Sequence, residues 1–576
     1  MKNASLFLLM NFIGITLISQ IIQPEINKEF LNKIDSIPEL VLSEESMQIE
    51  LPDSADNSKN IWFRDIISQE YGSCAQASGI GYVFTYEINR LRNQAAENEL
   101  FTPNYTYNYL NNANPYYGST FFDGWDILMQ SGCPNTYEWG GLYVDHRKWM
   151  TGYNKYYAAM QDRISGYYKI SFGKQAEGLD VLKHWLNDHN EGSETGGLAS
   201  VSVRVGSGGS IWAWEEIIEE FSDAEVGNYI FTQFAEINYL PRHGLTIVGY
   251  NDHVCHDFSG EGDITMDVDI NNDDTIDMRD WECGALKVVN STGEGFPDPE
   301  AIDKGFIFLP YRLLAGEEGI FLNKVYVINA AEEYSPKLTA KIIINHEERN
   351  KMSIYCGLAN NIVNVIPDDS IGFYAYNKQR GGSVCLQGNN CNAIQIGLDL
   401  TELIETNLYA KKLFLIIKEQ DENNEAYGVI HSFSIIDYED GNEIEIISPD
   451  NDIPINNNSI TRLAINYDYL STSINQDIII DNDFIVRKKI YIKNNSTITV
   501  LSDVNINFID NGKLIFENGS NLILGDNVSI KGKTNNNYIE VKGDFQIGNN
   551  VSFTSSENEQ WHGLILDNNE DITLSS

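Results

Sequence analysis

Cys74 stands at a position where a thiol can become a nucleophile. It follows a Gly-Ser turn and precedes an apolar run with helical spacing, which predicts a helix over Ala75–Asn93. The free N–H groups and the positive dipole end at a helix N-terminus stabilise a thiolate and lower the thiol pKa. We therefore expect Cys74 to be a reactive thiol, with a paired or buried cysteine as the alternative.

A cysteine nucleophile needs a base, and that base needs a group that orients it. His243 begins an apolar run that predicts a strand over His243–Tyr250, and Asn290 ends a second such run that begins at Gly284. An imidazole can take the thiol proton, and an amide can hold the imidazole ring in one plane. The pattern predicts that Cys74, His243 and Asn290 meet as a catalytic triad.

The sequences around these three residues resemble the motifs of the papain-like cysteine peptidases. The resemblance covers residues 51–332. It rests on segments similar to the family's nucleophile turn, His strand, Asn-Ser-Trp-Gly motif and mature N-terminus: Gly72-Ser73-Cys74, His243–Tyr250, Asn290-Ser291-Thr292-Gly293 and Leu51–Asp56. It implies a secreted peptidase that cleaves protein or peptide substrates, as an endopeptidase, through a thioester acyl-enzyme.

The resemblance also implies a role for each site residue. Cys74 attacks the carbonyl, His243 is its base, and Asn290 fixes the imidazole plane. The oxyanion hole would combine the backbone N–H of Cys74 with a side-chain amide, for which Gln69 is the candidate. Gln69 lies five residues before Cys74, one fewer than is usual in the family.

Three positions depart from the family pattern. Ala75 and Thr292 stand where the family has the tryptophans that shield the triad. Arg242, directly before His243, would depress the imidazolium pKa or bind an acidic group of a substrate. Two other functions stay open. One is a catalytically inactive papain-fold surface adhesin or binding protein, and the other is a transglutaminase-like acyl transferase with the same triad.

The order of the predicted elements favours an α+β fold over residues 51–332. Further helices are predicted near Gly124–Ser131 and at Lys174–Asn187, and strands follow from Leu198, including Gly284–Asn290 and Gly305–Pro310. Helices first and strands second predict a two-lobed domain. We expect the cysteine on the helical wall of a cleft, with the histidine and asparagine on the sheet wall.

An acidic insertion, about 255–283, separates the predicted histidine and asparagine strands. Oxygen-bearing side chains within it follow the spacing of a twelve-residue calcium loop, with apolar Ile276 at position 8. The loop resembles those of dockerins and EF-hands, although Asp274 replaces the usual glycine. We expect structural Ca²⁺ here, with a solvated acidic insertion as the alternative. The predicted ligands are Asp269, Asn271, Asp273, Thr275, Asp277 and Asp280.

The rest of the chain has the pattern of β structure. Alternating apolar residues between turns predict a β-sandwich over 335–448, followed by a linker at 449–476. Within 477–576, the segment that begins at Gly525 recurs 23 residues later at Gly548, which predicts a parallel β-helix or solenoid. We expect these β domains to be spacers or to bind a glycan or a protein ligand.

Charge and the N-terminus indicate where the protein acts. The chain has 39 basic and 83 acidic residues and a net charge of −44, which argues against nucleic acid and anionic membrane surfaces as partners. A positive start and a short apolar core predict a signal peptide at 1–20, with a retained anchor as the alternative. We expect a secreted or cell-surface protein without stable membrane insertion. Residues 21–50 would be a short pro-segment or a linker.

The cysteine count fits the same compartment. Seven cysteines in an exported chain fit one free reactive thiol and up to three disulfides. Cys385 and Cys391 close a short loop, and Cys255 and Cys283 flank the acidic insertion. These two pairs are the expected disulfides.

Overall fold

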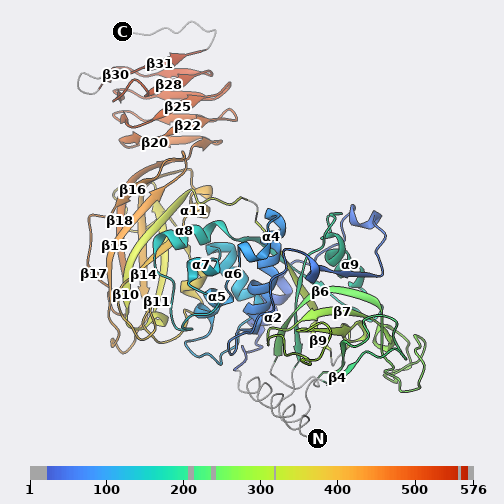
Figure 1. The fold of residues 1–576 in the computed structure, drawn as a ribbon. Helices are drawn as coiled ribbons and strands as arrows, with labels where there is room; N and C mark the ends of the chain where they lie inside the picture. Colours follow the sequence, from blue (N-terminus) through green and yellow to red (C-terminus); the bar gives the residue numbers. More distant parts are fainter. Residues whose placement is uncertain are drawn as a thin grey trace. The chain divides into compact units, whose positions relative to one another are not determined.

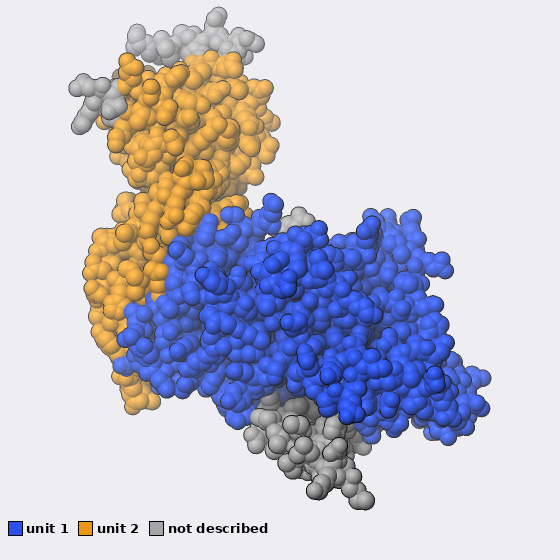
Figure 2. All heavy atoms as spheres, in the orientation of Figure 1, with its two compact units in different colours: residues 1–335, 346–351, 374–394 blue, residues 336–345, 352–373, 395–576 orange. Residues whose placement is uncertain are grey.

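The computed structural model describes residues 22–204, 213–234, 242–316, 319–331, 333–555 and 560–567. The predicted signal peptide at 1–20 lies outside the described residues. The chain divides into two compact units (Figure 2). Unit 1 comprises residues 1–335, 346–351 and 374–394, and unit 2 comprises residues 336–345, 352–373 and 395–576.

A long helix that begins at Cys74 runs through the helical half of unit 1. It consists of α3 (Cys74–Gln76), the π-helical turns of η3 (Ala77–Phe84) and α4 (Thr85–Arg92), in agreement with the predicted helix. Small residues let its neighbours approach, since a Cβ on Gly79 would meet the Trp125 ring at 3.1 Å. The other α-helices in the described part of unit 1 are α2 (Lys28–Ser36), α5 (Pro103–Leu110), α6 (Phe121–Ser131), α7 (Thr136–Trp139), α8 (Tyr153–Gln161), α9 (Leu179–Asp188) and α10 (Tyr374–Asn377); unit 2 contains α11 (Thr401–Thr406).

A mixed sheet forms the other half of unit 1. Its strand order is β2-β9-β3-β6-β7-β8-β5-β4, and β1 pairs with β6. Figure 1 shows α5, α6 and α7 gathered on one side of this unit and β6, β7 and β9 on the other. The α+β class is thus confirmed. Most helices precede the strands as predicted, but β1 comes before α3 and β2 comes before α9. The strands are β1 (Ser54–Asp56), β2 (Ile164–Ser171), β3 (Ala199–Arg204), β4 (Ala213–Glu216), β5 (Tyr229–Gln233), β6 (Arg242–Cys255), β7 (Cys283–Val289), β8 (Phe306–Pro310) and β9 (Ile320–Ala330).

Two disulfides link the expected cysteines. Cys255 pairs with Cys283, and Cys385 pairs with Cys391. The first disulfide joins the end of β6 to the start of β7 and so closes the acidic insertion at its base. Three cysteines are free rather than one, namely Cys74, Cys133 and Cys356, and all three are buried. No helix in the described part of the chain is both long and apolar enough to cross a bilayer.

Unit 2 begins with the predicted β-sandwich, built from two antiparallel sheets. One sheet has the order β13-β10-β15-β16, with β17 paired to β15, and the other has the order β12-β11-β14-β18. The Tyr467 hydroxyl donates to the Asp437 carboxylate at 2.8 Å and joins β18 to β15. The strands are β10 (Leu338–His346), β11 (Met352–Ala359), β12 (Asp369–Gly372), β13 (Ile394–Asp399), β14 (Tyr409–Glu419), β15 (Gly428–Asp437), β16 (Ile444–Ile447), β17 (Ile453–Pro454) and β18 (Ile460–Leu470).

The prediction of a linker at 449–476 is wrong over β18. This strand pairs with β14 from Ile460↔Lys418 to Leu470↔Tyr409 and buries alternate residues. The turn-rich stretch before Ile460 hides the alternation that follows it, so the sequence resembles a linker where a strand begins.

The predicted parallel solenoid follows and is confirmed. Three ladders of parallel strands enclose a column of buried Ile, Leu, Val and Phe side chains. The ladders are β19 (Ser473–Ile474), β22 (Lys489–Ile492), β25 (Lys513–Phe516), β28 (Tyr538–Val541) and β31 (Gly563–Leu566); β20 (Ile478–Ile480), β23 (Thr497–Val500), β26 (Asn521–Leu524) and β29 (Phe545–Ile547); β21 (Phe484–Val486), β24 (Asn505–Phe508), β27 (Ser529–Gly532) and β30 (Ser552–Ser555).

Candidate active site

The structure brings Cys74, His243 and Asn290 together. Cys74 is the first residue of α3, His243 is the second residue of β6, and Asn290 directly follows β7. The antiparallel pairing of β6 and β7 aligns the histidine with the asparagine, and His243 Nε2 lies 2.9 Å from Asn290 Oδ1. This contact leaves Nδ1 of the imidazole for the hydrogen bond with the thiol.

Close packing of β6 against the helix start sets the position of the thiol. A Cβ on Gly244 would lie 3.1 Å from the Cys74 carbonyl oxygen and 3.2 Å from the Ala75 Cα. A side chain at this position would push the strand and the helix start apart, so glycine favours this close approach. The three side chains are shielded from water, with Cys74 8% exposed, His243 3% and Asn290 0%.

The electrostatics of the pair favour a thiolate beside an imidazolium. Burial raises the pKa of the Cys74 thiol, but the charge and hydrogen bond of His243 and main-chain hydrogen bonds of Gly244 and Ala75 outweigh it, so this pKa is lowered. Burial lowers the pKa of His243, but Cys74 and Asn290 outweigh it, so this pKa is raised. A lowered thiol pKa and a raised imidazole pKa are the shifts that an ion pair produces.

The predicted oxyanion residue, Gln69, lies next to the asparagine motif. Its backbone N–H donates to the Ser291 carbonyl at 2.7 Å, and the Ser291 hydroxyl donates to Gln69 Oε1 at 2.5 Å. Its Nε2 donates to the Tyr71 carbonyl at 2.8 Å. Gln69 is not among the residues that line the pocket at Cys74. Its part in an oxyanion hole stays a prediction.

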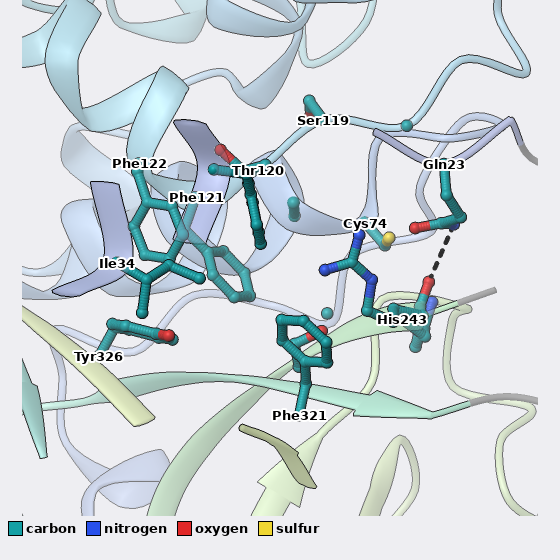
Figure 3. Close-up of a pocket in the computed structure, with 16 residues that line it drawn as sticks. Gln23, Ile34, Cys74, Ser119, Thr120, Phe121, Phe122, His243, Phe321 and Tyr326 are labelled. Carbon is teal, nitrogen blue, oxygen red and sulfur yellow. Dashed lines mark hydrogen bonds between the residues drawn. The ribbon is translucent and has the colours of Figure 1, made fainter. Parts of the chain in front are cut away.

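A pocket of about 40 Å³ opens beside Cys74, and its volume has room for a few water molecules but not for a peptide. Figure 3 shows Gln23 beside Cys74 and His243, and Ile34 beside Phe121, Phe122 and Tyr326. Both Gln23 and Ile34 belong to the N-terminal segment 22–50. This segment therefore forms part of the pocket wall beside Cys74. The residues that line the pocket are Gln23, Phe30, Ile34, Cys74, Ala75, Gly118, Ser119, Thr120, Phe121, Phe122, Ser202, Arg242, His243, Gly244, Phe321 and Tyr326.

Hydrogen bonds hold the beginning of this segment to both walls. Ile22 forms two main-chain hydrogen bonds of 2.7 Å, one to Tyr116 and one from Gly118. On the sheet wall, Gln23 Nε2 donates to the Arg242 carbonyl at 3.2 Å, and Arg242 Nη2 donates to the Pro24 carbonyl at 3.2 Å. The segment thus contacts Arg242, the residue before His243, twice.

Helix α2 anchors the segment farther along. The ring of Phe30 lies 6.5 Å from that of Phe122 and 6.3 Å from that of Phe321, and Ile34 is buried. Lys33 forms an ion pair of 2.7 Å with Asp126 of α6. The sequence analysis did not identify these contacts. The four-residue spacing of Phe30 and Ile34 could have predicted an amphipathic helix here, because it places both side chains on one face of a helix.

The predicted calcium loop has its carboxylates engaged by protein donors. Asp269 accepts from the N–H groups of Asp273 and Asp274, and Asp280 Oδ1 accepts from Ile270 and Asn271. The guanidinium of Arg279 pairs with both Asp273 and Asp277. Two predicted ligands therefore pair with a guanidinium in this structure. Within the described residues, no group of three or more His, Cys, Asp or Glu could hold a metal. Calcium stays a prediction.

Comparisons with known proteins add little beyond this geometry. No protein-family model and no curated protein matches the chain. Among solved structures, procathepsin B S9 from Trypanosoma congolense is 13% identical, with a TM-score of 0.32, and the match covers 55% of this chain and 88% of that one.

Two further similar structures are also proteases in their proforms. The Amb a 11 cysteine protease of ragweed pollen, in its proform, is 15% identical with a TM-score of 0.30, over 52% of this chain and 72% of that one. Digestive procathepsin L 3 of Tenebrio molitor larval midgut is 10% identical with a TM-score of 0.30, over 52% and 78%. At these scores, the function has to be inferred from the site itself.

Proposed function

We propose that this protein is a cysteine peptidase whose nucleophile is Cys74. The observation that carries the proposal is the meeting of a thiol at a helix N-terminus with His243 and Asn290 from the ends of neighbouring strands. The pKa shifts of Cys74 and His243 in the directions of an ion pair support it. A nucleophile, a base and an orienting amide in contact are the groups that acyl transfer requires.

The reaction follows from these positions. The Cys74 thiolate attacks the peptide carbonyl carbon, and the carbonyl π electrons move to oxygen, which the predicted oxyanion hole stabilises. As the tetrahedral species collapses, the C–N bond breaks and His243 donates its proton to the leaving amine, which leaves a thioester. Water then attacks the thioester while His243 takes a proton from it, and the C–S bond breaks to release the acid. Asn290 keeps the imidazole plane constant through both steps.

Residues 22–50 act in this proposal as a pro-segment that blocks the cleft. The support is the small pocket at Cys74 and the hydrogen bonds of Ile22, Gln23 and Pro24 to the cleft walls. The segment ends in a loop and the short 3-10 helix η1 (Ser46–Gln48), where Val41 and Met47 are exposed, so a second peptidase could cut there. Secretion or display at the cell surface would place the protein where such processing occurs.

Labelling of the thiol tests the proposal. A specific-protease site is introduced at Glu44-Glu45 of the full chain, and an epoxide probe for activated thiols is added before and after cleavage. We expect slow labelling of the intact protein, rapid labelling of Cys74 after the cut, and hydrolysis of a fluorescent protein substrate. A Cys133→Ala control keeps this labelling, because burial raises the pKa of the Cys133 thiol.

Two results would overturn the proposal. Cys74 in the cut protein could react no faster than a denatured thiol, which would leave a non-catalytic binding protein. Alternatively, the cut protein could incorporate amines without hydrolysing peptides, which would indicate acyl transfer.

A further inference from the structure

The side chain of Arg242 is buried beside the nucleophile with few partners. It lines the pocket at Cys74 and is 8% exposed. Its one hydrogen bond to the described residues runs from Nη2 to the Pro24 carbonyl, and its Nε has no hydrogen-bond partner. A buried guanidinium with unsatisfied donors is costly, because the charge has lost its water without gaining a counter-ion.

Within the part of the chain that the structure describes, no carboxylate pairs with this charge. Burial lowers the pKa of Arg242 to about 10, so the side chain stays protonated at neutral pH. The charged or ionisable groups that act on it are Tyr326, the Cys74 thiol and a second arginine, Arg204, its cross-strand neighbour on β3. Within the described residues, Arg242 forms no ion pair.

The partners that Arg242 does have come largely from the pro-segment. Besides the Pro24 carbonyl, the Phe30 ring lies 5.4 Å from the guanidinium, and the Phe321 ring of β9 lies 4.3 Å from it. Removal of residues 22–50 takes away Pro24 and Phe30. The guanidinium then faces an emptied pocket with an aromatic wall on one side and Ser119 and Thr120 among the polar lining residues.

Resting on the proposed function, we propose that Arg242 determines specificity by binding a substrate carboxylate. The ligand is the side chain of an acidic residue, Asp or Glu, next to the scissile bond of a peptide. A guanidinium presents paired N–H groups that match the two oxygens of a carboxylate. The aromatic wall would pack against the methylene groups of a Glu side chain. The pro-segment carbonyl occupies this position until the segment is removed.

Matched peptides test the assignment. The full chain with the cleavable Glu44-Glu45 site is cut, and kcat/KM is measured for fluorogenic peptides that differ only by Glu or Gln. The exchange is made at each position next to the scissile bond in turn. We expect Glu to be preferred over Gln by about tenfold or more at one position, because a charged hydrogen-bonded pair is lost with Gln. In Arg242→Met the ratio should fall to about one, and Arg242→Lys should keep part of it.

An arginine that does not line the pocket provides the control. Arg204→Met removes an equal charge from the strand beside β6 and should leave the Glu/Gln ratio unchanged. If wild-type protein cleaves both peptides equally, or if Arg242→Met keeps the ratio while cutting of the pro-segment becomes faster, the inference is overturned and Arg242 serves to hold the pro-segment. If Cys74 is not labelled and no peptide is cut, the proposed function itself fails. Melting curves of the two Arg242 variants confirm that both are folded.

Discussion

Two buried arginines of unit 1 differ in how many hydrogen-bond acceptors surround the guanidinium. Arg349 is 0% exposed and donates from all three guanidinium nitrogens to the carbonyl oxygens of Gly381, Arg147 and Asn108. Its guanidinium also lies 5.2 Å from the Trp149 ring. Arg242 is nearly as buried, yet among the described residues its side chain has one carbonyl partner, Pro24 of the N-terminal segment 22–50.

The difference separates a structural arginine from one available for binding. The backbone at Gly381 makes room for the Arg349 guanidinium. Gly381 has φ +64°, and a Cβ there would lie 2.4 Å from Nη2. Fully satisfied donors stabilise the fold that contains them. Donors left without partners in a pocket are available to a ligand.

The largest expected effect is a loss of activity without a loss of stability at Cys74, in contrast to the loss of stability expected at Arg349. Cys74→Ala should abolish peptide hydrolysis, a loss of several orders of magnitude, because no other group in the pocket supplies the thiolate. Stability should change little, since burial keeps the His243 imidazole neutral once the thiolate is gone. Hydrolysis assays and denaturant midpoints measure both effects. Residual hydrolysis that still requires His243 would contradict the assignment of the nucleophile.

Substitution of each arginine by methionine compares the two sites directly. Arg349→Met should lower the free energy of unfolding by about 3 kcal/mol, because buried carbonyl groups lose their donors. Arg242→Met should change it by less than about 1 kcal/mol, since it removes an unpaired buried charge. Denaturant midpoints of the two variants give the comparison. Equal losses would mean that Arg242 is structural as well.

Loss of the orienting amide should have a smaller effect than loss of the nucleophile. Asn290→Ala leaves the imidazole free to turn away from the sulfur, and a misplaced catalytic group costs about 100-fold in kcat. KM should change little, because Asn290 is fully buried. Steady-state kinetics separate the two parameters. An increase confined to KM would place Asn290 in substrate binding instead.

The smallest expected effect is that of Ca²⁺ on the melting temperature. It concerns a third polar cluster, the predicted calcium loop. An ion would have to displace Arg279 from Asp273 and Asp277, so we expect weak binding and a rise in melting temperature of a few degrees at most. Arg279→Gln frees both carboxylates and should strengthen binding. Calorimetry with Ca²⁺ alone measures this, and the absence of binding heat in both proteins would reject a calcium site.

The proximity of Cys74, His243 and Asn290 could be predicted from sequence, because each residue stands at the end of a regular element. Short local sequence patterns predict the helix start after Gly72 and the strands at His243 and Asn290. Contacts between residues far apart in the sequence leave no local pattern from which they could be predicted. The position of Gln23 at Arg242 depends on where the pro-segment crosses the cleft, and the pairing of Arg279 with Asp273 depends on rotamers. Strand β18 was missed because its alternation begins after a polar, turn-rich stretch.

The central claim is that His243 ionises Cys74, and the pH dependence of alkylation tests it most directly. In the cut protein, the rate of iodoacetamide reaction at Cys74 is measured from acid to alkaline pH. Because the thiol pKa is lowered, we expect rapid reaction well below the ordinary cysteine pKa of about 8.5. Peptide hydrolysis should decline again at alkaline pH as His243 loses its proton above its raised pKa. His243→Gln should move the alkylation curve to higher pH. A curve centred at about 8.5 in both proteins would contradict the account.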